Sequence, residues 1–198
     1  MTKRYILWSG GCDSTYLLHK LAIEDIDSVV NTLSITHTQV DKGQTKMEAQ
    51  ARNRITAELE KRGFYVRNQT VNLDFPIFHA DGFTQAGLWL GIAVMAIPED
   101  STLYLSYVRG DDFLEGKHLF EETWKDYCSL LDKEIKLQFP LIHTTKQKVL
   151  QELEKAKLLK LCWWCEEPKK NDTACGHCFS CVRMQHTRLL KDPYYKND

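Results

Sequence analysis

A glycine turn flanked by hydroxyl and carboxyl side chains lies near the start of the chain, and its composition suits the binding of a phosphate group. The residues are Ser9-Gly10-Gly11-Cys12-Asp13-Ser14-Thr15, called the phosphate loop below. The apolar run Tyr5–Trp8 precedes them, and Tyr16–Leu21 follows with a helical pattern. The first backbone N–H groups of a helix lack internal partners and carry partial positive charge. A strand, a glycine turn and a helix start in this order therefore predict an anion site.

The phosphate loop offers the groups that a phosphate and its counter-ion need. Gly10 and Gly11 permit a tight turn and a close approach of the backbone to a ligand. Hydroxyl donors come from Ser9, Ser14 and Thr15. Asp13 can orient a magnesium ion or cap the helix, and both interpretations are open. The spacing is neither that of a Walker A motif nor that of a dinucleotide-binding loop, so the residues predict a phosphate site of another kind.

A second group of chemically active residues lies near the C-terminus, where five of the seven cysteines fall: Cys162, Cys165, Cys175, Cys178 and Cys181. In a reducing cytosol, Cys-x-x-Cys spacing indicates a metal site rather than disulfides. Four thiolates enclose Zn²⁺ in a tetrahedron with no position open for water, which predicts a structural role. An iron–sulfur cluster is the main alternative.

The spacing alone leaves the fourth metal ligand open between Cys162 and Cys165, beside the other three cysteines. Gly176 fits the tight turn that lets neighbouring sulfurs converge on one ion. His177 and His186 lie near enough in sequence to be considered, but we interpret them as solvated side chains.

Alternating strands and helices are expected to position these residues. Strands are predicted at 4–8, 28–35, 65–73, 102–108 and 136–139, and helices at 13–22, 46–62, 86–97, 120–131, 147–159 and 179–190. Residues 36–45 are predicted as a polar loop. This alternation favours an α/β fold with a parallel sheet and helices on both faces. Ligands bind at the carboxyl ends of such strands. The turn Arg109-Gly110-Asp111-Asp112 is therefore expected on the same rim as the phosphate loop.

Length and composition restrict the class of protein. A chain of 198 residues with 43% hydrophobic and 27% charged residues is expected to form one domain with a small appendage, at 1–160 and 161–198. The net charge of -1 gives no field that would attract nucleic acid, so stable binding of nucleic acid is not expected. The longest apolar run, Leu88–Ile97, is too short to span a bilayer. A cytoplasmic protein without membrane association is expected.

The hexad Ser-Gly-Gly-x-Asp-Ser after the first strand resembles the pyrophosphate-binding loop of the N-type ATP pyrophosphatase superfamily. Its members cleave ATP between the α- and β-phosphates and adenylylate a substrate. The C-terminal segments Trp163–Pro168 and Ala174–Arg183 narrow the likeness, because together with the loop they resemble the 7-cyano-7-deazaguanine synthase (QueC) family. The family has a characteristic segment before its penultimate helix, and Phe139-Pro140-Leu141 followed by Thr145-Lys146 is similar to it. The family also has an acidic residue followed by an aromatic one, and Asp112-Phe113 is similar to that pair.

The resemblance implies a Rossmann-like (HUP/PP-loop) fold with a small C-terminal zinc-binding helical knuckle. It implies a homodimeric ligase of queuosine biosynthesis that converts 7-carboxy-7-deazaguanine, ammonia and ATP to the 7-cyano compound (preQ0), with Mg²⁺ and with Zn²⁺ held in the knuckle. The implied zinc ligands are Cys165, Cys175, Cys178 and Cys181. The implied nucleotide-binding residues are Ser9 to Thr15. The implied catalytic residues are Asp13, Ser14, Asp112 and Lys117.

Two segments depart from the family pattern, at residues 38–41 and 82–87, so the acceptor and the end point, amide or nitrile, are open. Lys146 is a further candidate to neutralise phosphate charge, and Arg109 can meet a carboxylate as a fork. One alternative is another adenylylating enzyme, such as one that thiolates tRNA, which would call on Cys12 and on a basic patch of Lys169, Lys170, Arg183, Arg188 and Lys191. The other alternative is a non-catalytic nucleotide-binding zinc module.

Overall fold

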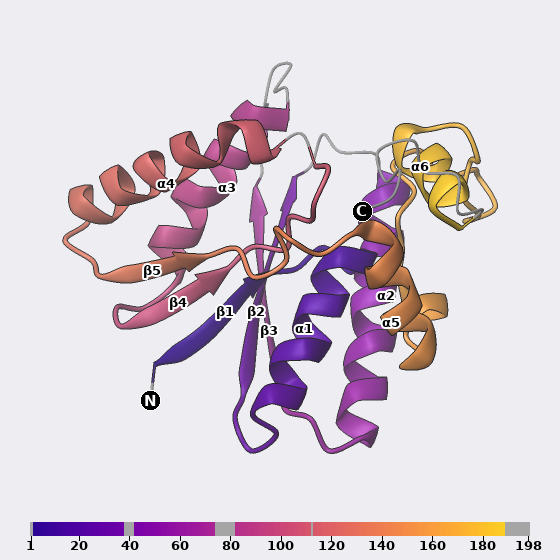
Figure 1. Ribbon diagram of the computed structural model, residues 1–198, viewed down its shortest axis with the longest axis horizontal. Helices are drawn as coiled ribbons and strands as arrows, with labels where there is room; N and C mark the ends of the chain where they lie inside the picture. Colours follow the sequence, from indigo (N-terminus) through magenta and orange to yellow (C-terminus); the bar gives the residue numbers. More distant parts are fainter. Residues whose placement is uncertain (1, 38–41, 74–81, 112, 189–198) are drawn as a thin grey trace.

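A five-stranded parallel sheet forms the centre of the molecule, with the strand order β3-β2-β1-β4-β5. The computed structural model describes residues 2–37, 42–73, 82–111 and 113–188. The chain builds β1, β2 and β3 outwards to one side and then returns to place β4 on the other side of β1 (Figure 1). The carboxyl ends of β1 and β4 therefore meet at a topological switch point, where α/β sheets bind ligands.

The elements follow the predicted alternation. The strands are β1 (Lys3–Leu7), β2 (Val30–His37), β3 (Val66–Leu73), β4 (Ser101–Tyr104) and β5 (Ile135–Gln138). The helices are α1 (Cys12–Glu24), α2 (Lys42–Lys61), α3 (Gly82–Ala96), α4 (Phe113–Leu130), α5 (Lys146–Lys155), the 3₁₀ turn η1 (Leu159–Leu161) and α6 (Phe179–Arg188). The expected α/β fold with a parallel sheet and helices on both faces is confirmed.

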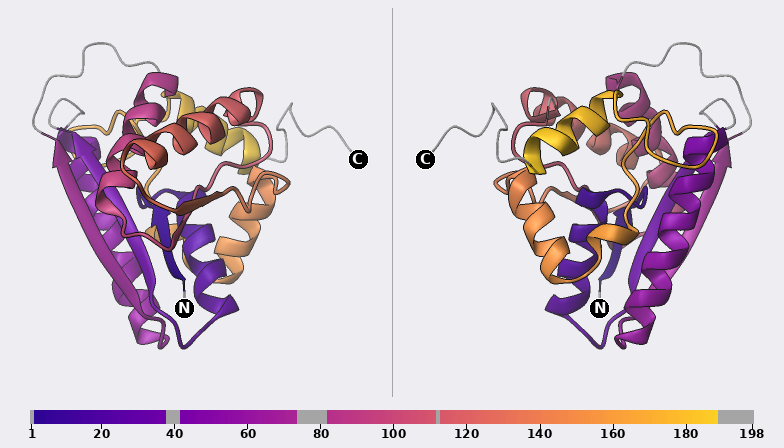
Figure 2. Two further views of the ribbon diagram at one scale, coloured as in Figure 1. Left: turned by 90° about the vertical axis from the view of Figure 1, so that its left-hand side faces the viewer. Right: turned by 90° about the vertical axis from the view of Figure 1, so that its right-hand side faces the viewer.

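Helices cover both faces of the sheet, as Figures 1 and 2 show. On one face α1, α2 and α5 pack around Leu17, Ile55 and Val149, which are fully buried. On the other face α3 and α4 pack around Val94 and Trp124. The sheet is therefore buried on both sides, which is typical of parallel sheets. The segment from η1 to α6 lies above the carboxyl ends of the strands, beside α2 and α5.

The predicted polar loop at 36–45 is wrong at both ends, because β2 continues to His37 and α2 already begins at Lys42. An i, i+4 hydrogen bond from the Gln44 amide to the Glu48 carboxylate, 2.9 Å long, supports the first turns of α2. These turns have no apolar face of their own, so periodicity could not reveal them. The fourth strand is shorter than predicted, because the chain leaves the ladder after Tyr104.

Thr145 caps α5, as the sequence predicts: its hydroxyl oxygen accepts a hydrogen bond from the Lys148 backbone N–H at 3.1 Å. Within the described residues, no helix is long and apolar enough to cross a membrane. The division of the chain at residue 160 stays a prediction.

Candidate functional site

The phosphate loop follows β1 directly, and buried contacts fix both of its ends. The indole N–H of Trp8, which is 1% exposed, donates to the Thr15 hydroxyl at 3.2 Å. The Trp8 carbonyl oxygen accepts a 2.6 Å hydrogen bond from the Ser34 hydroxyl of β2. The loop is thus tied to two neighbouring strands at the switch point, as the sequence predicts.

Helix α2 packs so closely on the loop that only glycine fits at position 10. Gly10 has a φ of +87°, and a β-carbon there would lie 3.1 Å from both the Glu48 carbonyl oxygen and a side-chain carbon of Arg52. The Arg52 guanidinium also donates to the Ser9 carbonyl oxygen at 3.2 Å. The glycine that the sequence marked as a turn residue is therefore required for packing as well.

The start of α1 presents hydrogen-bond donors towards a ligand. Gly11 occupies the N-cap position and has no side chain with which to cap the helix. The hydroxyls of Ser9 and Ser14 lie 3.4 Å apart beside this helix start, and the Ser14 hydroxyl is also 3.4 Å from the Gly11 carbonyl oxygen. Uncapped N–H groups and two hydroxyls converge here, which is the arrangement an anion site needs.

Asp13 and Lys146 form an ion pair across 133 residues of sequence. The Lys146 ammonium lies 2.5 Å from one Asp13 carboxylate oxygen, and both side chains are largely buried. Burial alone would lower the pKa of Lys146, but the Asp13 charge and its hydrogen bond outweigh it and raise that pKa, so the ammonium stays charged. The other carboxylate oxygen of Asp13 is buried without a hydrogen-bond partner among the described residues. A buried, unpartnered carboxylate oxygen beside a phosphate site suits a hard cation such as Mg²⁺.

The acidic turn after β4 is held by Asp111. Its carboxylate accepts a 2.8 Å hydrogen bond from the Val108 backbone N–H and forms a 2.7 Å ion pair with Arg183 of α6. Burial raises the pKa of Asp111 above its usual value, although Arg183 acts in the opposite direction. Asp112, a predicted catalytic residue, lies outside the described residues. Arg109 is exposed, and its backbone N–H donates to the Thr144 carbonyl oxygen at 2.9 Å.

Lys117, a predicted catalytic residue, contacts residues of α4 and of the segment after β5. It lies on α4, where it pairs with Glu121 one turn further on. Its ammonium is also 5.2 Å from the centre of the Phe139 ring. Lys146, which the sequence offered only as a further candidate, is instead the lysine that contacts the phosphate loop.

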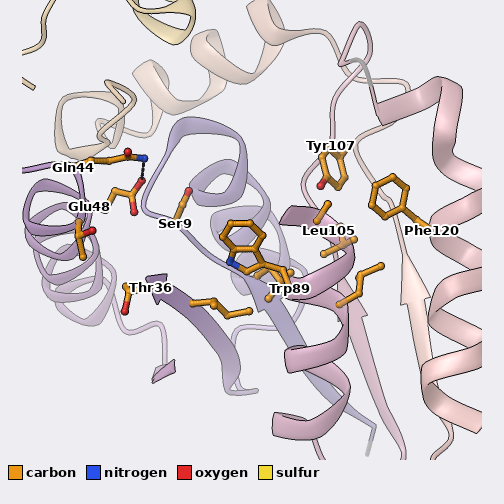
Figure 3. Close-up of a pocket in the computed structure, with 13 residues that line it drawn as sticks. Ser9, Thr36, Gln44, Glu48, Trp89, Leu105, Tyr107 and Phe120 are labelled. Carbon is orange, nitrogen blue, oxygen red and sulfur yellow. Dashed lines mark hydrogen bonds between the residues drawn. The ribbon is translucent and has the colours of Figure 1, made fainter. Parts of the chain in front are cut away.

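A pocket of about 340 Å³ opens beside the phosphate loop at the carboxyl ends of the strands (Figure 3). One end is polar and the other is aromatic, and the labelled lining residues are Ser9, Thr36, Gln44, Glu48, Trp89, Leu105, Tyr107 and Phe120. Burial raises the pKa of the Glu48 carboxyl, and burial together with Asp111 raises the pKa of Tyr107 to about 12. A pocket of this size and mixed lining suits a flat heterocycle with polar edges.

Sequence reasoning did not identify these pocket residues. Glu48 and Trp89 lie on segments that appear in the sequence only as helical patterns, so no local signal marked them. Tyr107 falls near the carboxyl end of the predicted strand 102–108, and this position on the ligand-binding rim was the one available sign.

The C-terminal cysteines converge as a group of four: Cys165, Cys175, Cys178 and Cys181. Their sulfurs all lie within 4.8 Å of one another, with Cys175–Cys181 at 3.9 Å and Cys178–Cys165 at 4.0 Å. A tetrahedral ZnS₄ site with Zn–S near ~2.3 Å requires sulfurs about 3.8 Å apart. These four residues, called the cysteine cluster below, therefore fit a zinc ion. His177 and His186 are both exposed.

Backbone N–H groups also point at the cluster sulfurs. The Cys165 sulfur accepts from the Cys175 N–H at 3.2 Å, and the Cys175 sulfur accepts from the Cys178 N–H at 3.3 Å. Hydrogen bonds of this kind stabilise thiolate ligands. Gly176 makes the turn between them with a φ of +85°.

Cys162, the competing ligand, lies apart from the cysteine cluster and contacts Cys12 of the phosphate loop. Both side chains are buried. The hydrogen bond between the two thiols, together with burial, raises the pKa of Cys12 well above its usual value. A raised pKa disfavours the thiolate form, which is the nucleophilic form of cysteine.

Two of the five residues of the basic patch considered from the sequence have named partners, and Lys169 and Lys170 are exposed. Arg183 is paired with Asp111, and Arg188 lies over the Trp164 ring with its guanidinium 5.3 Å from the ring centre. Lys191 falls outside the described residues.

Comparison with solved structures shows the same fold in two proteins that act on or are linked to tRNA. The structure superposes with a TM-score of 0.54 on the U34-tRNA thiolase NcsA from Methanococcus maripaludis with its [4Fe-4S] cluster, at 16% identity. The match covers 95% of this chain and 64% of the thiolase. It superposes with a TM-score of 0.50 on a predicted subunit of tRNA methyltransferase from Methanocaldococcus jannaschii, at 13% identity over 100% of this chain and 93% of that one. At such identities the likeness concerns the fold alone.

Comparison of sequences is more informative. Residues 116–188, which contain Lys146 and the cysteine cluster, match a family model described as Queuosine biosynthesis protein QueC. The chain is also 22% identical over 231 residues to the 7-cyano-7-deazaguanine synthase of Rickettsia akari (strain Hartford), which covers 100% of this chain and 96% of the relative. The family match at the C-terminal end and the full-length alignment agree with the phosphate loop and the fold, and they show that the chain is similar to the QueC family.

Proposed function

We propose that this protein uses ATP to adenylylate the carboxylate of a 7-deazaguanine and then captures ammonia, releasing pyrophosphate and AMP. The observation that carries the proposal is that Ser9 of the phosphate loop also lines a pocket with one polar and one aromatic end. Asp13, which forms the ion pair with Lys146, lies in the same loop. The family supplies the class of chemistry, and the pocket supplies room for the acceptor.

The phosphate loop would bind the β- and γ-phosphates of ATP. The uncapped N–H groups of α1 and the hydroxyls of Ser9 and Ser14 would stabilise the charge that builds on the leaving pyrophosphate. Lys146 would supply a fixed positive charge and keep Asp13 oriented. Asp13 is the residue that would hold Mg²⁺, which neutralises phosphate charge when bound.

The chemistry of the similar family supplies the proposed reaction, and these positions are compatible with it. The acceptor carboxylate attacks the α-phosphorus, the α–β bond breaks, and pyrophosphate leaves. Ammonia then attacks the acyl carbon and AMP leaves, which gives the amide. A second adenylylation, at the amide oxygen, followed by loss of AMP and protons gives the nitrile. Zn²⁺ in the cysteine cluster would have a structural role, because four thiolates close its coordination sphere.

The decisive experiment is ATP-to-AMP turnover with 7-carboxy-7-deazaguanine and ammonium, with mass spectrometry of the product. We expect AMP together with a product at the amide or the nitrile mass. The Ser14→Ala variant is expected to lower turnover by about 10²-fold, since it removes one donor beside the leaving group. Ser129→Ala, an exposed serine on α4, is the matched control.

The outcomes separate the three candidate functions. AMP formation without either product would indicate a different carboxylate acceptor. Retention on immobilised tRNA with a steep salt dependence would favour a tRNA-modifying enzyme. ATP binding without cleavage across all acceptors would favour a non-catalytic nucleotide-binding module.

Trp89 is expected to provide a flat surface for a bound ring at the pocket (Figure 3). Replacing it with alanine should weaken binding of the heterocyclic ligand by roughly tenfold, since ring stacking contributes about 0.5–1.5 kcal/mol. Trp89→Phe keeps an aromatic face and should recover most of the affinity. Calorimetric titration with the deazaguanine acid and with a non-hydrolysable ATP analogue shows which ligand the ring holds. Unchanged affinity for both ligands would place the heterocycle elsewhere.

A further inference from the structure

The segment between η1 and the cysteine cluster touches the phosphate loop directly. The backbone N–H of Trp163 donates to the Gly10 carbonyl oxygen at 3.0 Å. A β-carbon at Gly11 would lie 3.5 Å from the Trp163 carbonyl oxygen. The backbone of one residue thus lies against both loop glycines.

Trp163 contacts the cysteine cluster as well as the phosphate loop. Cys165 follows it by two residues, and the Trp163 indole N–H donates to the Cys165 carbonyl oxygen at 2.7 Å. The indole packs on the four cysteines and also on the core between α1, α2 and α5. A shift of the Cys165 sulfur would therefore move the residue that holds Gly10.

A second connection runs from the cysteine cluster to the turn after β4. Arg183 lies two residues beyond Cys181 on α6, and it forms the 2.7 Å ion pair with Asp111. The side chains are 24% and 16% exposed, so the pair is largely shielded from water. Asp111 in turn holds the Val108 N–H. The cysteine cluster is therefore connected to both sides of the switch point. Trp163 connects it to the loop after β1, and Arg183 connects it to the turn after β4.

We propose that the cysteine cluster positions the phosphate loop, so that metal binding to the cluster and nucleotide binding to the loop are thermodynamically coupled through Trp163 and Arg183. The proposal rests on the proposed function only in taking ATP as the ligand of the loop. Thiolate ligation orders the segment from Cys165 to Cys181. An ordered segment fixes the Gly10 carbonyl, and with it the direction of the N–H groups that follow. Coupling of two binding equilibria is reciprocal, so each ligand must strengthen the other.

The coupling is measured on the intact zinc-loaded protein, by competition for zinc with a colorimetric chelator. The titration is run with and without α,β-methylene-ATP, with Mg²⁺ in excess so that the nucleotide itself does not withdraw zinc. We expect the nucleotide to raise the zinc affinity by roughly 5- to 150-fold, the usual range of coupling between sites. Adenosine, which lacks the phosphates, should leave the zinc affinity unchanged.

Two variants at one position test the route. Trp163→Pro removes the N–H that Gly10 accepts from, and Cys162 already has the extended backbone (φ -72°, ψ 152°) that a residue before proline requires. Trp163→Ala loses the indole but keeps the N–H. We expect Trp163→Pro to weaken binding of α,β-methylene-ATP by about three- to tenfold and to remove the coupling. Trp163→Ala should lower thermal stability and retain the coupling.

Arg183→Gln tests the second connection and stands in if Trp163→Pro does not fold. Arg188→Gln is its matched control, since it removes the same charge from α6 without touching Asp111. Arg183→Gln should reduce the coupling factor at least threefold with zinc still stoichiometric, whereas Arg188→Gln should not.

These experiments distinguish a failure of the coupling from a failure of the proposed function. Equal zinc affinity with and without a nucleotide that does bind would overturn the coupling and leave the proposed function standing. A protein that binds no α,β-methylene-ATP at all would overturn both, because the loop would then not be a nucleotide site. Loss of coupling in Trp163→Ala as large as in Trp163→Pro would show that the indole, rather than the bond to Gly10, carries the effect.

Discussion

Replacing Lys146 with methionine is expected to lower ATP turnover by at least about 10²-fold and to destabilise the protein by about 3 kcal/mol. Methionine fills a similar volume but leaves the Asp13 carboxylate buried with neither oxygen partnered. Urea unfolding and AMP release measure the two effects separately. Lys148→Met is the matched control, because that lysine lies on the same helix, is half exposed and pairs only with Glu152 at the surface. It should leave the free energy of unfolding nearly unchanged, because exposed ion pairs contribute little.

The double variant Asp13→Asn/Lys146→Met separates stability from catalysis. It removes both charges, so no uncompensated carboxylate remains, and most of the lost stability should return. Turnover should not return, since neither the fixed cation nor the carboxylate oxygen for a metal ion is present. If Lys146→Met lost stability but kept wild-type turnover, the pair would be structural only and its proposed role in phosphate binding would be wrong.

The same ion pair predicts a pH dependence. The Asp13 carboxylate raises the pKa of Lys146 above its usual value of about 10.4. A raised pKa of a cation contributes stability that is fully present below the unfolded-state pKa and is lost as the pH rises through the folded-state pKa. The contribution of Lys146 should therefore be constant between neutral and mildly alkaline pH, and it should disappear only above about pH 10.

Replacing Cys178 with serine is expected to reduce bound zinc from one ion per chain to a small fraction of that. A serine oxygen is a poor substitute for thiolate in a closed four-sulfur site, and the ligand energy is also folding energy for the segment that the metal orders. We expect lower solubility and a lower melting temperature as well. Metal content is measured by mass spectrometry of the purified protein, with iron measured in parallel after anaerobic purification, since iron in place of zinc would indicate an iron–sulfur cluster.

Two further cysteine variants provide the matched control for the ligand set. Cys165→Ser should lose zinc as Cys178→Ser does, because its sulfur lies 4.0 Å from that of Cys178. Cys162→Ser should keep zinc stoichiometric, because its thiol contacts Cys12 and not the cysteine cluster. Retention of a full zinc ion by Cys165→Ser, or its loss from Cys162→Ser, would contradict the assignment of ligands.

Much of the fold and part of the site could be predicted from the sequence because they depend on local patterns. A strand, two glycines and a helix start within a dozen residues define the phosphate loop wherever the rest of the chain goes. The spacing of Cys175, Cys178 and Cys181 brings three sulfurs together within one turn. Alternation of strands and helices then requires a parallel sheet, with the loop and the turn after β4 on one rim. Helix starts without apolar periodicity, such as that of α2, were missed for the same local reason.

The sequence alone predicts that the phosphate loop is an anion site, but only the tertiary structure decided which residues contact it. Lys146, Trp163 and Arg52 come from three separate segments, and sheet order and helix packing bring them to the loop. The number of residues between two positions does not predict such contacts. The entropic cost of bringing the ends of a long connection together depends only weakly on its length, so many pairings are nearly equal in this cost. For the same reason, sequence spacing left Cys162 and Cys165 as alternative ligands, and only the folded structure groups Cys165 with the other three cysteines.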